Sequence, residues 1–345
     1  MISFECDYNN GAHPAVLDAL LRTNGEQTLT YGFDVYSDRA KERIRQACQA
    51  PQAEVHLLTG GTQTNLTVID ALLRSYEAVI AAESGHISIH EAGAIEGCGH
   101  KVITLPQKQG KIAAADVESY MEWFVHDESR EHLAQPALVY ISFPTELGTI
   151  YSRDEIEQLF AVCQHYGLQL FVDGARLGYG LAASPDVTLP WLCQHCDALY
   201  IGGTKVGALC GEAVVFTHGN TPRCFFTQAK RHGAILAKGR LTGVQFDALF
   251  APDDNGEPLY FRISRHAIDM AQRMKQIFIE KGLEFWLDSP TNQQFVVLHN
   301  EVVSRLEKLV QFTHWQPLDG DCMACRFVTS WATTDADLEQ LRRIV

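Results

Sequence analysis

The sequence predicts an α/β fold in which a mainly parallel sheet carries helices on both faces, followed by a smaller C-terminal α+β domain. Short apolar segments alternate with amphipathic helical segments, and this pattern is typical of parallel sheets covered on both sides. Polar and glycine-rich residues also stand directly after the apolar segments, at Gly60, His86, Thr145, Asp173 and Lys205. Because the carboxyl ends of parallel strands share one edge of a sheet, we expect these residues to lie close together.

The predicted elements follow one another along the chain. Residues 1–30 form an N-terminal arm with too little apolar surface to fold alone, so the arm must pack on the body or on another subunit. In the body, strands are predicted at 55–58, 78–82, 101–105, 137–143, 170–173, 198–201 and 213–216, and helices at 37–48, 87–95, 116–124 and 153–166.

The segment 251–258 is rich in Pro, Asp and Gly and resembles a linker. We therefore expect a large domain at 31–250 and a small domain at 251–345. The small domain is predicted to contain helices at 260–282, 302–310 and 335–343, and strands at 295–298 and 326–331.

The composition limits the classes of partner. The 345 residues include 28 basic and 42 acidic side chains, giving a formal net charge of −14 without any block of lysines and arginines. We therefore expect neither nucleic acid nor a membrane as a partner. No apolar segment reaches membrane-spanning length and the first residues do not resemble a signal peptide, so a cytoplasmic location is expected.

The chain has 10 cysteines, which are expected to be free thiols in a cytoplasmic protein. Two CxxC pairs, Cys193/Cys196 and Cys322/Cys325, have the spacing of zinc ligands, but they stand far apart in the chain. The first pair falls on a predicted helix and the second at the start of a predicted strand. We expect packing positions here and no metal site.

A predicted strand, the turn Thr59-Gly60-Gly61-Thr62 and the start of a helix follow one another. Free main-chain N–H groups and the helix dipole favour an anion at such a turn. Neither of the glycine-rich nucleotide motifs occurs, so a single phosphate is indicated. The alternative is an ordinary helix N-cap at Thr62 or Thr64.

Lys205 and Asp173 together indicate a site for pyridoxal 5'-phosphate (PLP) in the large domain. Each follows a predicted strand, Lys205 within Gly203-Thr204-Lys205 and Asp173 before Gly174-Ala175-Arg176. A PLP enzyme needs a lysine that holds the aldehyde as a Schiff base and an acid that pairs with the protonated ring nitrogen. Singly, each residue has a simpler interpretation, as a surface lysine or as a helix cap. His86 could likewise stack on the ring or cap the following helix.

With these residues in place, the chain resembles the L-threonine aldolase family, in the beta-eliminating lyase group of fold-type-I PLP enzymes. The matching segments are Tyr31-Gly32-x-Asp34, Gly60-Gly61-Thr62-x-Thr64-Asn65, His86-x-x-x-His90-Glu91-Ala92-Gly93-Ala94, Asp173-Gly174-Ala175-Arg176-Leu177, Gly203-Thr204-Lys205, Lys230-Arg231 and Arg326-Phe327. The resemblance implies the PLP-dependent transferase-like fold of that group.

The resemblance also implies roles at the cofactor. Lys205 matches the Schiff-base lysine and Asp173 matches the partner of the ring nitrogen. Gly61 and Thr62 match the phosphate cup, and His86 matches a stacked histidine that is also a candidate base.

Further matches concern the substrate and the subunit interface. Arg176 and Arg326 match the arginines that bind the substrate carboxylate, and Cys6 stands where the family has a serine in contact with it. The remaining matches are Arg231, which would bind the phosphate in a neighbouring subunit, Tyr31 in an arm that crosses a dimer interface, and His132 as a second catalytic histidine. The chain departs from the family pattern at four points: Cys6-Asp7 replaces Ser-Asp, Gly60-Gly61-Thr62 replaces Ser-Gly-Thr, Phe143-Pro144-Thr145 replaces Glu-Asn-Thr, and Thr204-Lys205 replaces Ser-Lys.

The implied reaction is the retro-aldol cleavage of L-threonine-type or L-allo-threonine-type β-hydroxy-α-amino acids to glycine and an aldehyde. The enzyme would be a carbon–carbon lyase that acts as a homodimer or homotetramer with shared active sites. Two alternatives stay open: PLP-dependent β-elimination on another amino acid, which releases ammonia and a keto acid, and a non-catalytic PLP-fold binding protein.

Overall fold

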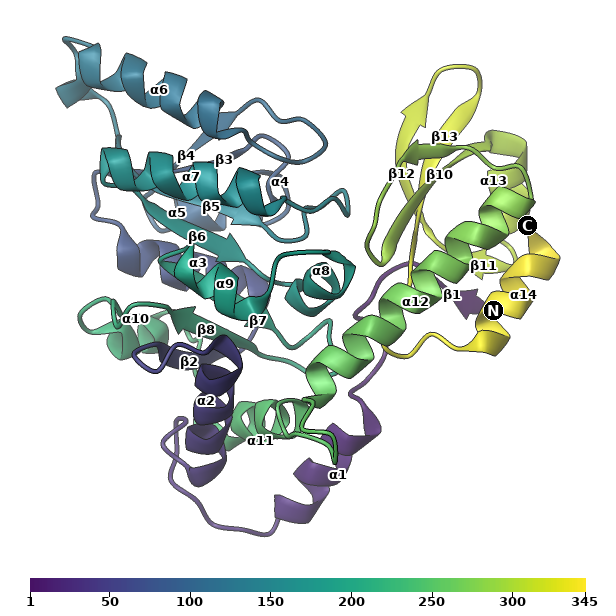
Figure 1. The fold of residues 1–345 in the computed structure, drawn as a ribbon, viewed down its shortest axis with the longest axis horizontal. Coiled ribbons are helices and arrows are strands. Elements are labelled where there is room, and N and C mark those ends of the chain that lie inside the picture. Colours follow the sequence, from purple (N-terminus) through teal and green to yellow (C-terminus); the bar gives the residue numbers. More distant parts are fainter.

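A seven-stranded sheet forms the centre of the larger of two lobes in the computed structural model, which describes residues 1–345 (Figure 1). The strands stand in the order β2 (Glu54–Leu58), β8 (Glu212–Phe216), β7 (Ala198–Gly202), β6 (Gln169–Asp173), β5 (Gln135–Ser142), β3 (Glu77–Ala82) and β4 (Lys101–Leu105). β8 runs antiparallel to both of its neighbours, and the other pairs are parallel. The predicted mainly parallel sheet is confirmed.

Alternate side chains of each strand enter two different cores, one on each face of the sheet. On β5, Val139 and Ile141 belong to one core, whereas Leu138 and Tyr140 belong to the other. The first core is covered by α1 (Pro14–Thr23), α2 (Val35–Cys48), α6 (Ala114–His126), α7 (Arg153–Tyr166), α8 (Leu177–Ala183), α9 (Leu189–Gln194) and α11 (Arg240–Leu249). The second core is covered by α3 (Gly61–Leu72), α4 (His86–Ile89), α5 (Ala94–Gly97) and α10 (Phe225–Arg231).

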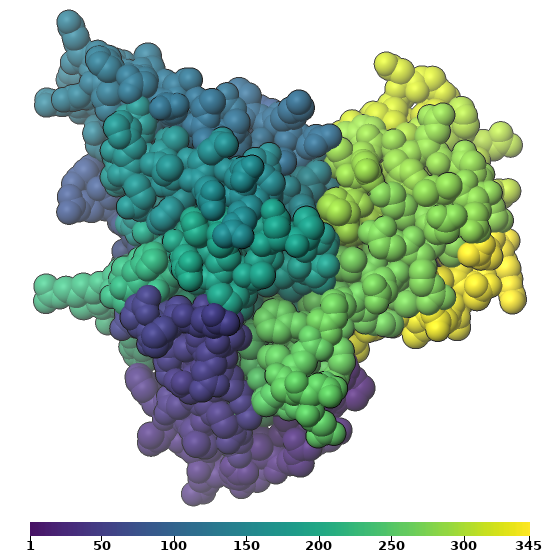
Figure 2. All heavy atoms as spheres, in the orientation of Figure 1, coloured from purple at the N-terminus to yellow at the C-terminus, as the bar shows by residue number.

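The smaller lobe contains an antiparallel sheet in the order β12 (Thr313–Leu318), β13 (Cys322–Val328), β10 (Gln293–His299) and β9 (Phe285–Leu287). The long helix α12 (Leu259–Glu280) joins the two lobes, with Tyr260 in the first core and Met274 in the core of the smaller lobe. Helices α13 (Asn300–Leu306) and α14 (Asp335–Ile344) complete the smaller lobe. Figure 2 shows it as a green-to-yellow body packed beside the larger lobe.

The N-terminal segment packs on both lobes of its own chain. Strand β1 (Ile2–Ser3) pairs with β11 (Val310–Gln311), and Phe4 is buried in the core of the smaller lobe. Val16 of α1 is buried in the core of the larger lobe. Figure 1 accordingly places both chain ends at the smaller lobe. A two-residue strand has no periodicity, so the sequence pattern gives no sign of it.

Several predicted element bounds are wrong. The predicted helix at 87–95 is broken into α4 and α5, because Ala92 and Gly93 adopt positive φ angles of 51° and 71°. The predicted helix at 302–310 ends at Leu306, and Val310 lies in β11. The strand predicted at 326–331 begins earlier, as β13, and β9 and β12 were not predicted.

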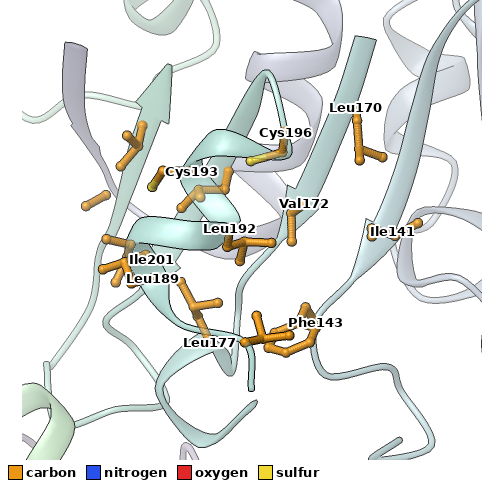
Figure 3. Close-up of a cluster of buried hydrophobic side chains, with 14 of the residues drawn as sticks. Ile141, Phe143, Leu170, Val172, Leu177, Leu189, Leu192, Cys193, Cys196 and Ile201 are labelled. Atoms are coloured by element: carbon orange, nitrogen blue, oxygen red, sulfur yellow. The ribbon is translucent and has the colours of Figure 1, made fainter. Parts of the chain in front are cut away.

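The two CxxC pairs lie in different lobes. Cys193 and Cys196 are buried at α9 among leucine, isoleucine and valine side chains of the first core (Figure 3). Cys322 and Cys325 belong to β13, and none of the 10 cysteines forms a disulfide. None of the helices combines the length and the apolarity that crossing a membrane requires.

Candidate active site

A cavity of about 570 Å³ lies at the carboxyl edge of the large sheet. The turns after β2, β3, β5, β6 and β7 all contribute to its wall, as the positions of the polar residues in the sequence predict. The smaller lobe closes the wall with Thr313, Trp315 and Arg326, and Tyr8 adds an aromatic ring from the N-terminal segment.

Asp173 ends β6 as a buried, heavily hydrogen-bonded carboxylate. Its Oδ2 accepts hydrogen bonds from the Asn65 amide at 2.9 Å and from the Tyr140 hydroxyl, and its Oδ1 accepts one from the Ala175 main chain at 2.9 Å. Burial alone would raise the pKa of Asp173, but His86 and these hydrogen bonds hold the pKa below its ordinary value. A permanent negative charge therefore faces the cavity.

Lys205 lies in the turn after β7, and its main-chain oxygen accepts a hydrogen bond from the Tyr179 hydroxyl at 2.6 Å. Its ammonium forms no ion pair and lies 5.8 Å from the centre of the Tyr8 ring. Burial and the charge of Arg176 lower the pKa of Lys205, so the neutral amine is more accessible than on a surface lysine. A neutral amine is the form that attacks a carbonyl carbon.

The turn that carries Lys205 is held from β8 by Glu212. Its Oε2 accepts a hydrogen bond from the Gly203 main chain at 2.9 Å, and its Oε1 accepts one from the Thr204 hydroxyl at 2.8 Å. Burial raises the pKa of Glu212 to about 7. Nothing in the sequence pattern marks this residue as part of the site.

His86 begins α4 and is oriented by Glu91. The His86 Nδ1 lies 2.7 Å from the Glu91 Oε1, which also accepts a hydrogen bond from Asn65 at 2.7 Å. Burial disfavours the His86 imidazolium, but Glu91 and Asp173 outweigh it and raise the pKa of His86. Because Nδ1 is engaged by Glu91, the face of the ring and its Nε2 atom are the parts of His86 available to a ligand in the cavity.

Two guanidinium groups face the same cavity. Arg176 donates to Asp7, from Nε to Oδ2 at 2.7 Å and from Nη2 to Oδ1 at 3.0 Å. On β13, Arg326 donates to the Gln293 side chain and to the Thr313 hydroxyl, both at 3.2 Å. Two cations on one wall form a site for a carboxylate.

The start of α3 forms an anion site at another part of the wall. Gly60 precedes the helix and no side chain caps it, so the alternative of an N-cap at Thr62 or Thr64 does not apply. Gly61 and Thr62 line the cavity with N–H groups that lack partners within the helix. A small anion can bind there.

Comparison with known proteins agrees with this geometry. The family model for the beta-eliminating lyases matches residues 7–289. The chain belongs to the beta-eliminating lyase family. This membership confirms the predicted family and the assignment to the lyases.

Three relatives of this lyase cover most of its length. A Leishmania major threonine aldolase structure superposes with a TM-score of 0.93, with 39% identity and 100% of both chains covered. A low specificity L-threonine aldolase from Pseudomonas aeruginosa is 27% identical over 99% of this chain and 95% of its own length. The aspartate aminotransferase of Thermus thermophilus, at 13% identity and a TM-score of 0.69, shares the fold. The predicted fold-type-I architecture is confirmed.

The residues of this beta-eliminating lyase fit PLP, the cofactor that membership of a PLP-dependent family implies. The start of α3 suits the phosphate, the Asp173 carboxylate suits a protonated ring nitrogen, and Lys205 offers the amine that an aldehyde needs. These groups occupy different parts of one wall, so a single molecule can reach all of them.

Other predicted site residues of this lyase lie outside the cavity. Cys6 does not line it, so the expected substrate contact is not seen; Tyr8 lines the cavity instead, and Asp7 is bonded to the wall residue Arg176. The Tyr31 ring lies under the Lys230 ammonium at 3.9 Å, and Arg231 is paired with Asp70 at 3.3 Å.

His132 cannot serve as the second catalytic histidine of its own chain. It is exposed in the 3₁₀ turn Arg130–His132, which precedes the start of β5. The cavity lies at the other end of that strand, so His132 does not reach the site of its own chain. The position of this loop in the sequence does not indicate at which edge of the sheet the loop lies.

Proposed function

We propose that this beta-eliminating lyase cleaves β-hydroxy-α-amino acids of the L-threonine and L-allo-threonine type to glycine and an aldehyde, with PLP as its cofactor. The observation that carries this proposal is the convergence of Lys205, Asp173, Arg176 and Arg326 on one cavity. The similarity to threonine aldolases from Leishmania major and Pseudomonas aeruginosa supports the choice of substrate.

Four groups would hold the cofactor. Lys205 would bind its aldehyde carbon, Asp173 its ring nitrogen, and Gly61 with Thr62 its phosphate, while His86 would lie against the ring. When bound, PLP supplies an electron sink for the pair of electrons left at Cα. The lowered pKa of Asp173 keeps this residue anionic and therefore keeps its partner nitrogen protonated.

The two arginines would bind the substrate carboxylate and so fix the orientation of Cα. Asp7 keeps the Arg176 guanidinium in place, and Trp315 lies 5.2 Å from the Arg326 guanidinium. Lys205 Nζ, with its lowered pKa, can hold a proton beside Cα and return it there to complete glycine.

We also propose that the protein is a homodimer or homotetramer in which Arg231 and Tyr31 complete the site of a neighbouring subunit. Arg231 is 63% exposed and does not line the cavity of its own chain. Exposed apolar side chains stand in the same region of the chain, namely Leu29, Phe33, Val35 and Phe226. The Phe33 and Phe226 rings lie 5.4 Å apart and form the centre of an apolar surface suited to subunit contact. The free thiols support a cytoplasmic location.

The test is product analysis with purified protein, PLP and either L-threonine or L-allo-threonine. We expect equal amounts of glycine and acetaldehyde, and no product from Lys205→Ala. Release of ammonia and a keto acid would instead identify the β-elimination alternative. Absence of any product, with bound cofactor, would favour the non-catalytic alternative and contradict the proposal.

A further inference from the structure

Glu146 is a carboxyl group in the cavity wall to which the proposed function assigns no role. It follows β5, in the turn after Pro144. Its Oε1 accepts hydrogen bonds from the His86 main-chain N–H at 3.0 Å and from the Ser142 hydroxyl at 2.6 Å. Its Oε2 accepts none, and no lysine or arginine forms an ion pair with it. One oxygen is therefore fixed and the other is free to bind a ligand.

The substituents of a bound β-hydroxy-α-amino acid would each contact a different part of this cavity wall. The amine must reach Lys205 and the carboxylate must reach the two arginines. The side chain with its hydroxyl is left with the rest of the wall, where the candidate proton acceptors are His86, His90, Glu146 and Glu212. Both oxygens of Glu212 already accept hydrogen bonds from the turn that carries Lys205, which leaves the other three. Carbon–carbon cleavage requires one of them to take the hydroxyl proton.

The two histidines are less suited than Glu146. The Nδ1 of His86 is bonded to the Glu91 carboxylate, which favours an imidazolium that already carries its proton. His90 is exposed and forms no side-chain hydrogen bond that would fix its ring. Glu146 alone is held by two donors with one oxygen left over, and proton transfer is efficient only from a fixed position.

We propose that Glu146 accepts the proton of the substrate's β-hydroxyl group as the Cα–Cβ bond breaks. This inference rests on the proposed function. The O–H bond breaks and its proton goes to Glu146 Oε2, while the O–H electron pair forms the carbonyl of the aldehyde. The electron pair of the Cα–Cβ bond stays with the Cα fragment, which becomes glycine once Cα is protonated. Burial raises the pKa of Glu146, which strengthens a carboxylate as a base.

The experiment compares wild type, Glu146→Gln and a control, Glu83→Gln. Glu83 follows β3 at the same edge of the sheet, but it is exposed and lies outside the cavity. Three quantities are measured: the kcat of L-threonine cleavage, the exchange of the glycine α-proton with deuterated water, and the absorption spectrum of bound PLP. Glycine exchange uses the cofactor and the arginines but involves no hydroxyl group.

In Glu146→Gln we expect cleavage to fall by roughly 100-fold to 10,000-fold, the usual contribution of a general base, while glycine exchange and the cofactor spectrum stay as in wild type. The Glu83→Gln control should match wild type in all three measurements. Cleavage at the wild-type rate in Glu146→Gln would overturn the proposal. An equal loss of cleavage and glycine exchange, or a changed spectrum, would also overturn it, because Glu146 would then act on the cofactor.

Glu146→Asp provides a second test if the glutamine variant does not fold. The shorter side chain keeps the carboxyl group but withdraws it from the cavity, so cleavage should fall while glycine exchange persists. Wild-type cleavage in this variant would contradict the proposal. Failure of the wild-type protein itself to release glycine and acetaldehyde would be recognised separately, because it overturns the proposed function as well.

Discussion

The Asp7 carboxylate accepts two hydrogen bonds from the Arg176 guanidinium, from Nε at 2.7 Å and from Nη2 at 3.0 Å. This pair joins the N-terminal segment to the turn after β6, and Asn292 donates a further hydrogen bond to Asp7 at 3.0 Å. Because Asp7 occupies Nε and one N–H of Nη2, the remaining N–H groups of Arg176 are available to a substrate carboxylate. The N-terminal segment thus sets the direction of a substrate-binding arginine.

Asp7→Asn should therefore weaken both the fold and substrate binding. Removing one charge of a buried ion pair costs about 3 to 5 kcal/mol, because the other charge stays buried without its partner. Urea unfolding should show a loss of this order, and KM should rise more than kcat falls. The exposed Asp18 provides a control, as Asp18→Asn, that should leave both quantities unchanged.

The same pair predicts a pH dependence. Burial works against the Asp7 carboxylate, but Arg176 and Lys205 hold the pKa of Asp7 below 3.8. Because the pKa of Asp7 is lower in the folded state, its carboxylate stabilises the fold at pH values above 3.8. This stabilisation is lost as the pH falls through the pKa of the folded state. The stability difference between wild type and Asp7→Asn should thus persist at neutral pH and shrink in acid. A difference that grows in acid would contradict this assignment.

Glu91→Gln should lower the pKa of His86. The Glu91 carboxylate favours the His86 imidazolium across a 2.7 Å contact, and a neutral amide loses that effect. We expect the NMR titration midpoint of His86 to move to lower pH than in wild type, where the pKa is raised above 6.5. The exposed Glu96 gives the control variant Glu96→Gln. An unchanged midpoint in Glu91→Gln would show that Glu91 does not govern His86.

Glu212→Gln should make stability less dependent on pH. The pKa of Glu212 rises from 4.5 to about 7 in the folded state, so its favourable contribution is complete below 4.5 and is lost as the pH rises through about 7. A rise of that size corresponds to roughly 3 kcal/mol. Unfolding free energies at pH 5 and pH 8 should differ less in Glu212→Gln than in wild type. The exposed Glu118 offers the control Glu118→Gln, and equal pH dependence in all three proteins would contradict the prediction.

Arg231→Ala and Lys205→Ala should complement each other if subunits share active sites. Each variant alone should be nearly inactive, since one lacks the phosphate contact from its neighbour and the other lacks the amine. Refolding an equal mixture should restore about a quarter of the wild-type sites, because a mixed dimer contains one site with both residues intact. Cleavage assays of the mixture test this, with unmixed variants as controls. If oligomers shown to contain both variants regain no cleavage activity, Arg231 does not contribute to the site of the neighbouring subunit.

The sequence pattern correctly places at the edge of the sheet the residues that stand at strand ends. Asp173 and Lys205 follow apolar segments, and the order of parallel strands brings such positions together, so the pattern was sufficient. No comparable pattern marks Asp7, because its partner Arg176 is remote along the chain. The sequence pattern likewise does not indicate the hydrogen bond that the His86 main-chain N–H donates to Glu146, or those that Glu212 accepts from the turn of Lys205.

For His132 the sequence pattern is less informative. A histidine in a charged loop matched the expected residue type, but residue type does not indicate on which edge of a sheet a loop lies. The helix break at Ala92, where φ is positive, comes directly after Glu91, whose side chain contacts His86. Local helix propensity does not reflect such tertiary contacts, which can override it.

The most direct test of the account is to locate bound PLP on the chain. The purified protein is incubated with PLP, reduced with borohydride and digested, and the modified peptide is identified by mass spectrometry. We expect a pyridoxyl group on Lys205 and none in Lys205→Ala. Modification of a different lysine, or an unmodified chain after incubation with excess PLP, would contradict it.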